Sequence, residues 1–431
     1  MSTQLARIAA KARADTRVCF TSLAHVMTEE FLAETWTKLN RKGAAGVDRE
    51  TIETYALNLD ERLRDLQQRL KQGRYRAPPV RAVEIPKSNG KVRMLGIPTV
   101  EDRLVQAAVA RLLNAVFEPV FLDCSYGFRP GKSAHHALKT LREQIVCKPV
   151  MQVYEADIRA FFDRVSHTWL RRMLRQRVAD KTLLRLIDKW LQAGVMREGL
   201  VSERGEGVPQ GGPVSPILSN IYLHYALDLW FEKKVKPAMR GHAAIIRFAD
   251  DFVACFQYAS DVKRFETVLP RRLEKFEIAI APEKTRRLLF GRFAAERLAA
   301  LGRKPQEFVF LGFRHICGLG QDGRFALIRL PANDRLRRFR ASAKLWLRQH
   351  NHWKVRDQQQ KLSQMLQGFY AYYGITHCTG KLAGVHHYVV YMWRKTLLRR
   401  SQRAKRKAHW SILKKKSWFV LPTPLRVHNW V

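Results

Sequence analysis

The sequence predicts an α+β fold, and three observations along its 431 residues support this prediction. Residues 29–75 carry apolar side chains at helical spacing beneath a charged face. From Pro78 onward, short apolar runs alternate with turn signals, which is typical of strands. Residues 331–431 return to helical spacing with a basic composition. A chain of this length is expected to form two or three domains, and we place them at residues 1–75, 76–320 and 321–431.

The N-terminal domain is expected to be a helical extension. Leu59, Leu63, Leu66 and Leu70 recur at helical spacing. Residues 1–27 are basic, and their charges interrupt the apolar core that a signal peptide needs. We therefore predict a surface helix at the N-terminus and no secretion.

The middle domain is expected to open with a β-hairpin. Val80–Ile85 and Val92–Ile97 have the composition of strands, and the segment Lys87–Gly90 between them contains an Asn-Gly turn signal. A helix is predicted to follow over Glu101–Phe117.

Two further apolar runs, at residues 150–158 and 243–256, predict buried strands, and both carry aspartates. Asp157 lies near the end of the first run, and Asp250 and Asp251 lie at the expected tip of a hairpin. Burying such carboxylates is costly unless a positive group joins them, and Mg²⁺ prefers carboxylate oxygen. Three aspartates on neighbouring strands could hold two ions about 3.5–4 Å apart. An exposed hairpin turn is the alternative explanation for the aspartate pair.

A glycine-rich segment at residues 207–223 combines a turn with the start of an apolar helix. Its glycines permit close approach of the backbone to another group. The N-terminus of the helix suits an anionic or base-paired neighbour.

The charge of the chain points to a polyanionic partner. Lys and Arg number 78 and Asp and Glu 38, so the formal net charge is +40. Nucleic acid is the first candidate, because phosphate contacts by Lys and Arg supply most non-specific affinity. An anionic membrane surface is the second, although no stretch approaches the roughly 18 apolar residues of a spanning helix. The six cysteines form no C-x-x-C pair, which argues against zinc and disulfides and favours a cytoplasmic location.

The C-terminal domain holds much of this charge. Residues 331–431 contain 22 Lys or Arg and two acidic residues. Leu336, Phe339, Ala343 and Trp346 form one stripe at helical spacing, and a parallel stripe is basic. We predict a small basic helical domain in which the following cations contact RNA phosphates, with a merely solvated face as the alternative: Arg337, Arg340, Lys344, Arg348, Arg399, Arg400, Lys405, Arg406 and Lys407.

Eight short motifs occur in a characteristic order. They are Gly46-Val47-Asp48, Ile85-Pro86-Lys87, Gly96-Ile97-Pro98-Thr99, Ser125–Gly131, the Asp157 strand, Pro209-Gln210-Gly211-Gly212, Phe248–Asp251 and Leu311-Gly312-Phe313. In order and spacing they resemble those of group II intron-encoded reverse transcriptases, also called maturases. The resemblance runs from about residue 40 to the end, because Gly368–Gly374 and Pro422–His428 are similar to the family's thumb, or maturase, domain.

This resemblance implies a right-hand polymerase with fingers, palm and thumb. It implies that Asp157, Asp250 and Asp251 bind two Mg²⁺ ions, with Mn²⁺ as the alternative ion, in an RNA-directed DNA polymerase that uses a two-metal mechanism. The implied partners are dNTPs, an RNA template with a DNA or RNA primer, target DNA and the group II intron RNA whose splicing and mobility the protein assists. It also implies a bacterial ribonucleoprotein in the cytoplasm, without a membrane partner.

The resemblance further implies a nucleotide site. Phe162 matches an aromatic gate that clashes with a ribose 2′-hydroxyl, and Gln210 helps to position the nucleotide. Lys87 and Arg93 match triphosphate contacts, and Lys284 is expected near the phosphates. The competing explanation for Phe162 is core packing. The competing explanation for the cations is that they are solvated loop charges. The Leu311–Phe313 turn resembles the primer grip, although an ordinary strand bend also explains it.

The chain differs from longer relatives in lacking the Cys pairs and the His-Asn-His motif of their C-terminal endonuclease domain. It therefore resembles the compact branch of the family, and we do not expect it to cleave target DNA itself. Three alternatives stay open: a host-adopted relative in DNA repair or phage defence, a splicing-only RNA-binding maturase, and an RNA-dependent RNA polymerase, which Phe162 disfavours.

Overall fold

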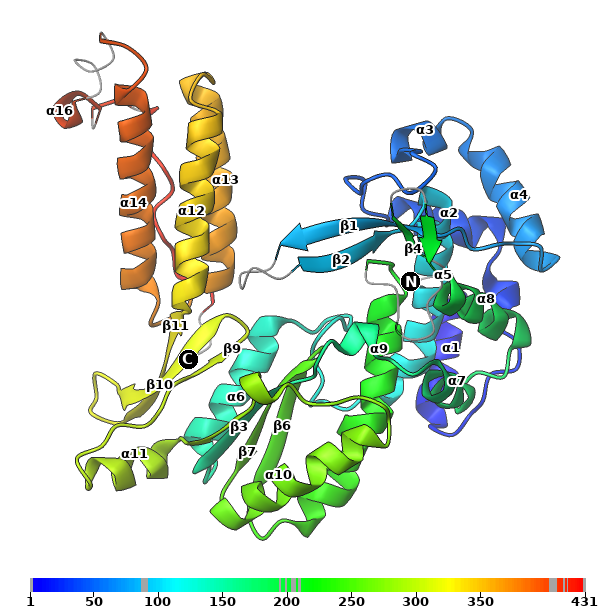
Figure 1. Ribbon diagram of the computed structural model, residues 1–431, viewed down its shortest axis with the longest axis horizontal. Coiled ribbons are helices and arrows are strands. Elements are labelled where there is room, and N and C mark those ends of the chain that lie inside the picture. The colour runs from blue at the N-terminus through cyan, green and yellow to red at the C-terminus, as the bar shows by residue number, and fades with distance from the viewer. Residues whose placement is uncertain are drawn as a thin grey trace. The chain divides into compact units, whose positions relative to one another are not determined.

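A computed structural model of the chain describes residues 3–86, 92–193, 195–197, 200–202, 207, 211–402, 409–413, 415–416 and 418–428. The chain divides into two compact units. The first unit comprises Met1–Ala137, Tyr154–Ala254 and Tyr258–Arg287, and the second comprises Leu138–Val153, Cys255–Gln257 and Leu288–Val431. Figure 1 shows the helices and strands of both units.

The first unit begins with a series of helices. The helices are α1 (Thr3–Ala14), α2 (Glu29–Thr37), α3 (Ile52–Ala56), α4 (Leu59–Lys71) and α5 (Val100–Phe117). Threonine hydroxyls cap the N-termini of α2, α3 and α5, because Thr28, Thr51 and Thr99 each accept a hydrogen bond from the backbone N–H three residues later. Leu63, Leu66 and Leu70 are buried, as their spacing predicts. A short 3-10 turn, η1 (Ala24–Val26), precedes α2.

Helix α5 forms the centre of this core. Its Asp102 carboxylate is buried and accepts hydrogen bonds from Tyr75 Oη at 2.7 Å, Trp190 Nε1 at 2.6 Å and Gln106 Nε2 at 2.9 Å. Burial raises the pKa of Asp102, and the three donors oppose that rise. The carboxylate therefore joins α5, the segment before β1 and helix α8 (Lys181–Gln192).

The predicted hairpin is confirmed. Strand β1 (Val80–Pro86) pairs antiparallel with β2 (Val92–Ile97), and Ile85 lies opposite Arg93. The turn at Lys87–Gly90 lies outside the described residues. Two short strands, β4 (Val195–Arg197) and β5 (Leu200–Ser202), extend the sheet in the order β2-β1-β4-β5.

A second sheet has the order β6-β7-β3-β8 and contains the predicted buried strands. Its strands are β3 (Gln152–Asp157), β6 (Ala243–Phe248), β7 (Asp251–Phe256) and β8 (Arg286–Leu289). Helix α10 (Ala259–Glu274) packs against it, with Phe265 edge-on to Tyr154 at 5.5 Å (Figure 1). Phe252, Val253 and Ala254 of β7 are fully buried. The apolar runs therefore become the strands of a covered sheet.

Further helical elements surround this sheet in the first unit. They are η2 (Glu118–Val120), η3 (Phe161–Asp163), α7 (His167–Arg175), α9 (Ser215–Leu223), the π-helical η4 (His224–Asp228) and η5 (Phe231–Val235), η6 (Lys236–Ala238) and η7 (Pro282–Lys284). Two of the short elements adjoin strands of this sheet: η3 follows β3, and η7 precedes β8.

The second unit combines a three-stranded sheet with long helices. It begins with most of α6 (Ala134–Cys147) and with helix α11 (Arg292–Ala299). The strands are β9 (Phe308–Phe310), β10 (Phe313–Leu319) and β11 (Phe325–Pro331). They are followed by α12 (Asn333–Gln349), α13 (Val355–Tyr373), α14 (Thr379–Leu398) and the short α16 (Trp410–Leu413). Leu362 and Leu366 of α13 are buried, and this helix ends at Gly374 as predicted. Trp393 of α14 is buried and donates to Gln358 Oε1 at 3.0 Å.

Two predictions from composition concern membranes and thiols. No helix among the described residues has both the length and the apolar character that crossing a bilayer requires. All six cysteines are free thiols.

The Asp102 contacts lead to a prediction about stability. Replacing Asp102 with Ala leaves the buried Tyr75 hydroxyl and the Trp190 indole N–H without an acceptor, so the free energy of unfolding should fall by about 2–4 kcal/mol. Urea unfolding followed by far-UV circular dichroism measures this loss. Asp65→Ala removes an exposed carboxylate from α4 and serves as the control. Equal stability of the two variants would contradict the assigned role.

Candidate active site

The turn between β6 and β7 presents two aspartates. Asp250 follows β6, and Asp251 is the first residue of β7. Ala249, just before them, has a φ of 57°, in the left-handed region that residues other than glycine rarely adopt. The predicted hairpin with Asp250 and Asp251 at its tip is therefore present.

Asp157 ends β3, the strand next to β7. Its carbonyl oxygen accepts from the Ala281 N–H at 2.8 Å, which brings the 3-10 turn η7 beside the strand end. Lys284, the last residue of that turn, donates from Nζ to Asp157 Oδ2. The Lys284 side chain is 62% exposed and that of Asp157 only 18%, so the cation covers the carboxylate from the solvent side.

Electrostatics show that the three aspartates act on one another. Burial raises the pKa of Asp251 well above its usual value, and repulsion from Asp157, Asp250 and Glu155 raises it further, whereas Lys284 lowers it. The hydrogen bond to Asp157 in turn raises the pKa of Lys284. The site therefore combines mutually repelling carboxylates with a nearby lysine.

The described residues contain no group of three His, Cys, Asp or Glu side chains already arranged to hold a metal ion. The donor set nevertheless fits a hard divalent cation, because carboxylate oxygens are its preferred ligands and a cation would relieve the repulsion at Asp251. The Lys284 ammonium occupies one oxygen of Asp157 in this arrangement. Metal binding through that oxygen would require Lys284 to move.

A cavity of about 710 Å³ lies in the first unit, and Phe162 lines it. Phe161 is the ring buried in the core, while Phe162 meets it edge-on at 5.6 Å and is only partly buried. Core packing alone therefore accounts for Phe161 and not for Phe162. The cavity wall also includes Leu95 of β2, Phe128 and residues of the α2–α3 connection.

Three glycines bring the glycine-rich segment against its neighbours. A Cβ at Gly207 would lie 2.8 Å from Phe162 O, and one at Gly211 would lie 2.4 Å from Gly96 O. A Cβ at Gly212 would lie 2.1 Å from Gln106 Oε1. A side chain at any of these positions would displace the backbone or the amide that it meets. The glycines therefore allow Gly207 to lie against Phe162, Gly211 against β2 and Gly212 against α5.

Some predicted nucleotide contacts cannot be placed. Lys87 and Gln210 lie outside the described residues, as do Lys405, Arg406 and Lys407 in the C-terminal cluster. The backbone of Arg93 lies in β2 opposite Ile85. The roles of these residues stay predictions.

The other predicted RNA contacts lie on α12 and directly after α14 in the second unit. Arg337, Lys344 and Arg348 of α12 are exposed, whereas Arg340 is partly buried with its guanidinium 5.5 Å from the centre of the Tyr388 ring. Arg399 and Arg400 are also exposed, and Arg400 Nη2 donates to the Trp353 carbonyl at 2.7 Å.

The predicted primer-grip turn is a tight connection between β9 and β10. Leu311 and Gly312 both have positive φ, at 50° and 76°. The Tyr372 hydroxyl donates to Leu311 O at 2.8 Å, which fixes the turn to α13.

Sequence reasoning missed the residues that support the aspartate turn. Arg247 of β6 is fully buried and pairs with Asp228, also fully buried, at 2.6 Å. The only signal in the sequence is an arginine inside an apolar strand, two residues before the turn. Asp228 carries no comparable signal, because its position inward depends on the π-helical turn η4.

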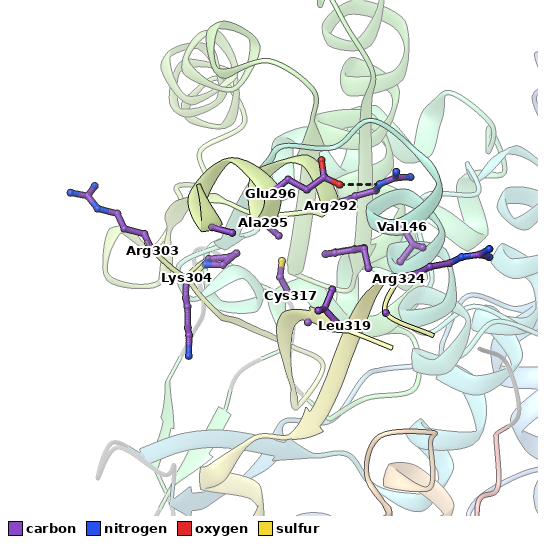
Figure 2. Close-up of a pocket in the computed structure, with 14 residues that line it drawn as sticks. Val146, Arg292, Ala295, Glu296, Arg303, Lys304, Cys317, Leu319 and Arg324 are labelled. Carbon is purple, nitrogen blue, oxygen red and sulfur yellow. Dashed lines mark hydrogen bonds and ion pairs between the residues drawn. The ribbon is translucent and has the colours of Figure 1, made fainter. Parts of the chain in front are cut away.

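A second cavity, of about 870 Å³, lies in the second unit between α11 and the β10–β11 hairpin (Figure 2). Cys317 and Leu319 line it, and Arg292 pairs with Glu296 on α11. The ends of Arg303 and Lys304 extend away from the middle of the cavity in Figure 2. No sequence-predicted site residue lies here.

Comparison with known proteins agrees with this geometry. Residues 85–315 match the family model described as reverse transcriptase (RNA-dependent DNA polymerase). Protein YkfC of Escherichia coli is 33% identical over 377 residues, which cover 81% of this chain and 96% of YkfC. The group II intron-encoded protein LtrA of Lactococcus lactis is 38% identical over 200 residues, 46% of this chain and 33% of LtrA. The nuclear intron maturase 4 of Arabidopsis thaliana is 30% identical over 135 residues, 30% of this chain and 16% of that protein.

The chain thus spans nearly the whole of YkfC but only a third of LtrA. The matched family model covers both predicted strands with their aspartates and the turn between β6 and β7. The chain therefore belongs to the reverse transcriptase family, among the relatives of the group II intron-encoded proteins.

Proposed function

We propose that this reverse transcriptase binds two divalent metal ions through Asp157, Asp250 and Asp251. The observation that carries the proposal is the convergence of three repelling carboxylates at the ends of two adjacent strands. Such ions, when bound, activate the attacking 3′-hydroxyl and stabilise the leaving pyrophosphate. Mg²⁺ is the proposed ion, and Mn²⁺ is the proposed substitute.

Lys284 has two proposed tasks at this site. Without metal it neutralises Asp157, to which it donates. With metal bound, the same flexible, largely exposed ammonium is free to reach the phosphates of an incoming dNTP. Lys87 and Arg93 of the β1–β2 hairpin are proposed to bind the triphosphate, and Gln210 is proposed to position the nucleotide.

Phe162 is proposed to select deoxyribonucleotides. Its ring lines the 710 Å³ cavity together with Gly211 and Gly212, whereas Phe161 fills the core. A ribose 2′-hydroxyl would meet this ring. An RNA-copying enzyme that makes RNA has no need of such a barrier.

The right-hand division is part of the proposal. The β1–β2 hairpin corresponds to fingers, the β6-β7-β3-β8 sheet to the palm, and helices α12–α14 to the thumb. The proposed domain boundaries remain residues 1–75, 76–320 and 321–431.

The second proposed activity is binding of a group II intron RNA to assist its splicing and mobility. Two relatives are named for intron functions. Exposed cations on α12 and at the end of α14 support phosphate binding in the second unit. An RNA template–primer duplex, whose A-form backbone is read by shape and charge, is the other proposed occupant. Target DNA is the proposed destination of the cDNA.

The aspartate centre is tested by substitution. Asp250→Asn and Asp251→Asn should each lower dNTP incorporation at least about a hundredfold, because each removes one metal-binding charge. Primer extension on an RNA template measures incorporation, and filter binding measures RNA affinity, which should stay unchanged. Asp65→Asn on α4 is the control. Undiminished cDNA synthesis by either variant would refute the metal assignment.

The gate is tested by sugar discrimination. Phe162→Ala should raise rNTP incorporation relative to dNTP incorporation by about 10–100-fold, because it removes the ring that meets the 2′-hydroxyl. Single-nucleotide kcat/KM values for each sugar give the ratio. Phe128→Ala removes another ring from the same cavity and should leave the ratio unchanged. If both variants shift the ratio equally, the cavity as a whole and not Phe162 sets the preference.

The RNA surface is tested by its salt dependence. The triple variant Arg337→Gln, Lys344→Gln and Arg348→Gln should weaken binding of an intron RNA about tenfold or more. The slope of log affinity against log salt should become shallower by about 2–3, because each removed cation leaves one RNA phosphate with its counterions. The matched control is Lys233→Gln with Lys234→Gln and Lys236→Gln in the first unit. An unchanged slope would show that the α12 cations face only solvent.

A further inference from the structure

We propose that Arg247 is a positioning residue for DNA synthesis, because its buried guanidinium fixes the turn that carries Asp250 and Asp251. This inference deepens the proposed function and rests on those aspartates being the metal-binding centre. It adds a specific claim, namely that the geometry of the centre depends on an arginine that touches neither substrate nor metal.

Every N–H of the guanidinium has an acceptor. Nη1 donates to Ala249 O at 2.9 Å and to Asn220 Oδ1 at 3.2 Å. Nη2 donates to Ser125 Oγ at 2.7 Å and to Asp228 Oδ2 at 2.6 Å. Nε donates to Asp228 Oδ1 at 2.7 Å. Five donors in a fixed plane are a property of arginine that lysine does not share.

The residue that this network holds is strained. Ala249 has a φ of 57°, which costs about 1–2 kcal/mol in a residue with a Cβ. Its carbonyl is bonded to Nη1, and its amide nitrogen lies so close to Gly127 that a Cβ there would be 2.4 Å away. Asn220 Nδ2 donates to Gly127 O at 2.7 Å, which ties that glycine to the same network. Ala249, the residue before Asp250, is therefore held at both its carbonyl and its amide nitrogen.

The network also explains the Ser125–Gly131 motif in physical terms. Arg247 N donates to Cys124 O at 2.8 Å, and Tyr126 N donates to Arg247 O at 2.9 Å, so the motif runs alongside β6. Its Ser125 supplies one acceptor and its Gly127 the close approach to Ala249. Arg129 of the same motif holds the segment by donating to Ser125 O at 2.8 Å.

The ion pair itself is a poor source of stability. Arg247 and Asp228 are both 0% exposed, and burying such a pair costs several kcal/mol per ion in desolvation, so an apolar pair of equal volume often stabilises as well. Asp228 reaches inward from the π-helical turn η4, a rare element that is frequent at functional sites. The π-helical turn η4, the strained Ala249 and the buried ion pair thus meet at the Arg247 guanidinium. Together they set the geometry of the turn between β6 and β7.

The expected consequence is catalytic. Without the bond to its carbonyl, Ala249 relaxes toward negative φ, and the two following carboxylates move with it. A displacement of about 1 Å at reacting groups costs about a hundredfold in rate. The proposed RNA-binding cations lie on other elements, so Kd for RNA should change little, and KM for dNTP should change little when it is measured at saturating Mg²⁺.

The test compares Arg247→Lys with Arg177→Lys in the full-length protein. Arg177 is also buried in the first unit and donates to the Ala12 and Thr16 carbonyls, so its replacement measures the cost of losing a buried guanidinium elsewhere. Arg247→Lys should lower kcat about 10–100-fold and raise the half-saturating Mg²⁺ concentration, with KM for dNTP and Kd for RNA within about twofold. Arg177→Lys should lower Tm without these changes.

A rescue variant separates positioning from stability. Glycine adopts positive φ without strain, so adding Ala249→Gly to Arg247→Lys should recover part of the lost kcat while Tm stays low. If Arg247→Lys does not fold, Ser125→Ala removes one acceptor and should give a smaller loss of kcat of the same kind. A kcat that falls only in proportion to Tm, as for Arg177→Lys, or an absent rescue, would overturn the inference.

The outcome also separates this inference from the function on which it rests. An active Asp250→Asn variant refutes the metal centre whatever Arg247→Lys does. An inactive Asp250→Asn variant together with a fully active Arg247→Lys variant refutes only the positioning role.

Discussion

Repulsion among carboxylates is the constraint around which the first unit is built. Asp157, Asp250 and Asp251 raise one another's energy at the ends of adjacent strands, and burial of Asp251 adds to the cost. The sheet cannot relax by spreading these ends apart, because β7 is packed fully inside. The buried sheet and α5 stabilise the unit, and this stability offsets the energetic cost of the acidic end of the sheet.

Strands β3, β6 and β7 were predictable from the sequence because their apolar runs are long. The β1–β2 hairpin followed from its two apolar runs, and the α13 end followed from Gly374. The family motifs located the three aspartates and Phe162. What the sequence could not reveal is long-range: Asp102 meets donors 27 and 88 residues away, and Arg247 meets Ser125 122 residues away. Neither periodicity nor local propensity encodes such partners.

The charge of +40 takes on a different meaning with the fold in view. Many cations of the second unit lie exposed on α12, whereas those of the first unit include arginines committed to internal contacts, such as Arg129, Arg177 and Arg247. Net charge therefore overstates the surface available for phosphates. Some arginines act as interior cross-links, for which five donors matter more than the positive charge.

The ion pair between Lys284 and Asp157 means that each of these two charges already has a partner within the protein. While Lys284 donates to Asp157 Oδ2, a cation at that oxygen must displace the ammonium, and a phosphate must share its three donors with Asp157. In the proposed mechanism, metal competes with Lys284 for that oxygen, so metal binding and the availability of the ammonium for phosphate are thermodynamically linked. In the proposed mechanism a single lysine thus couples the metal site to the nucleotide site.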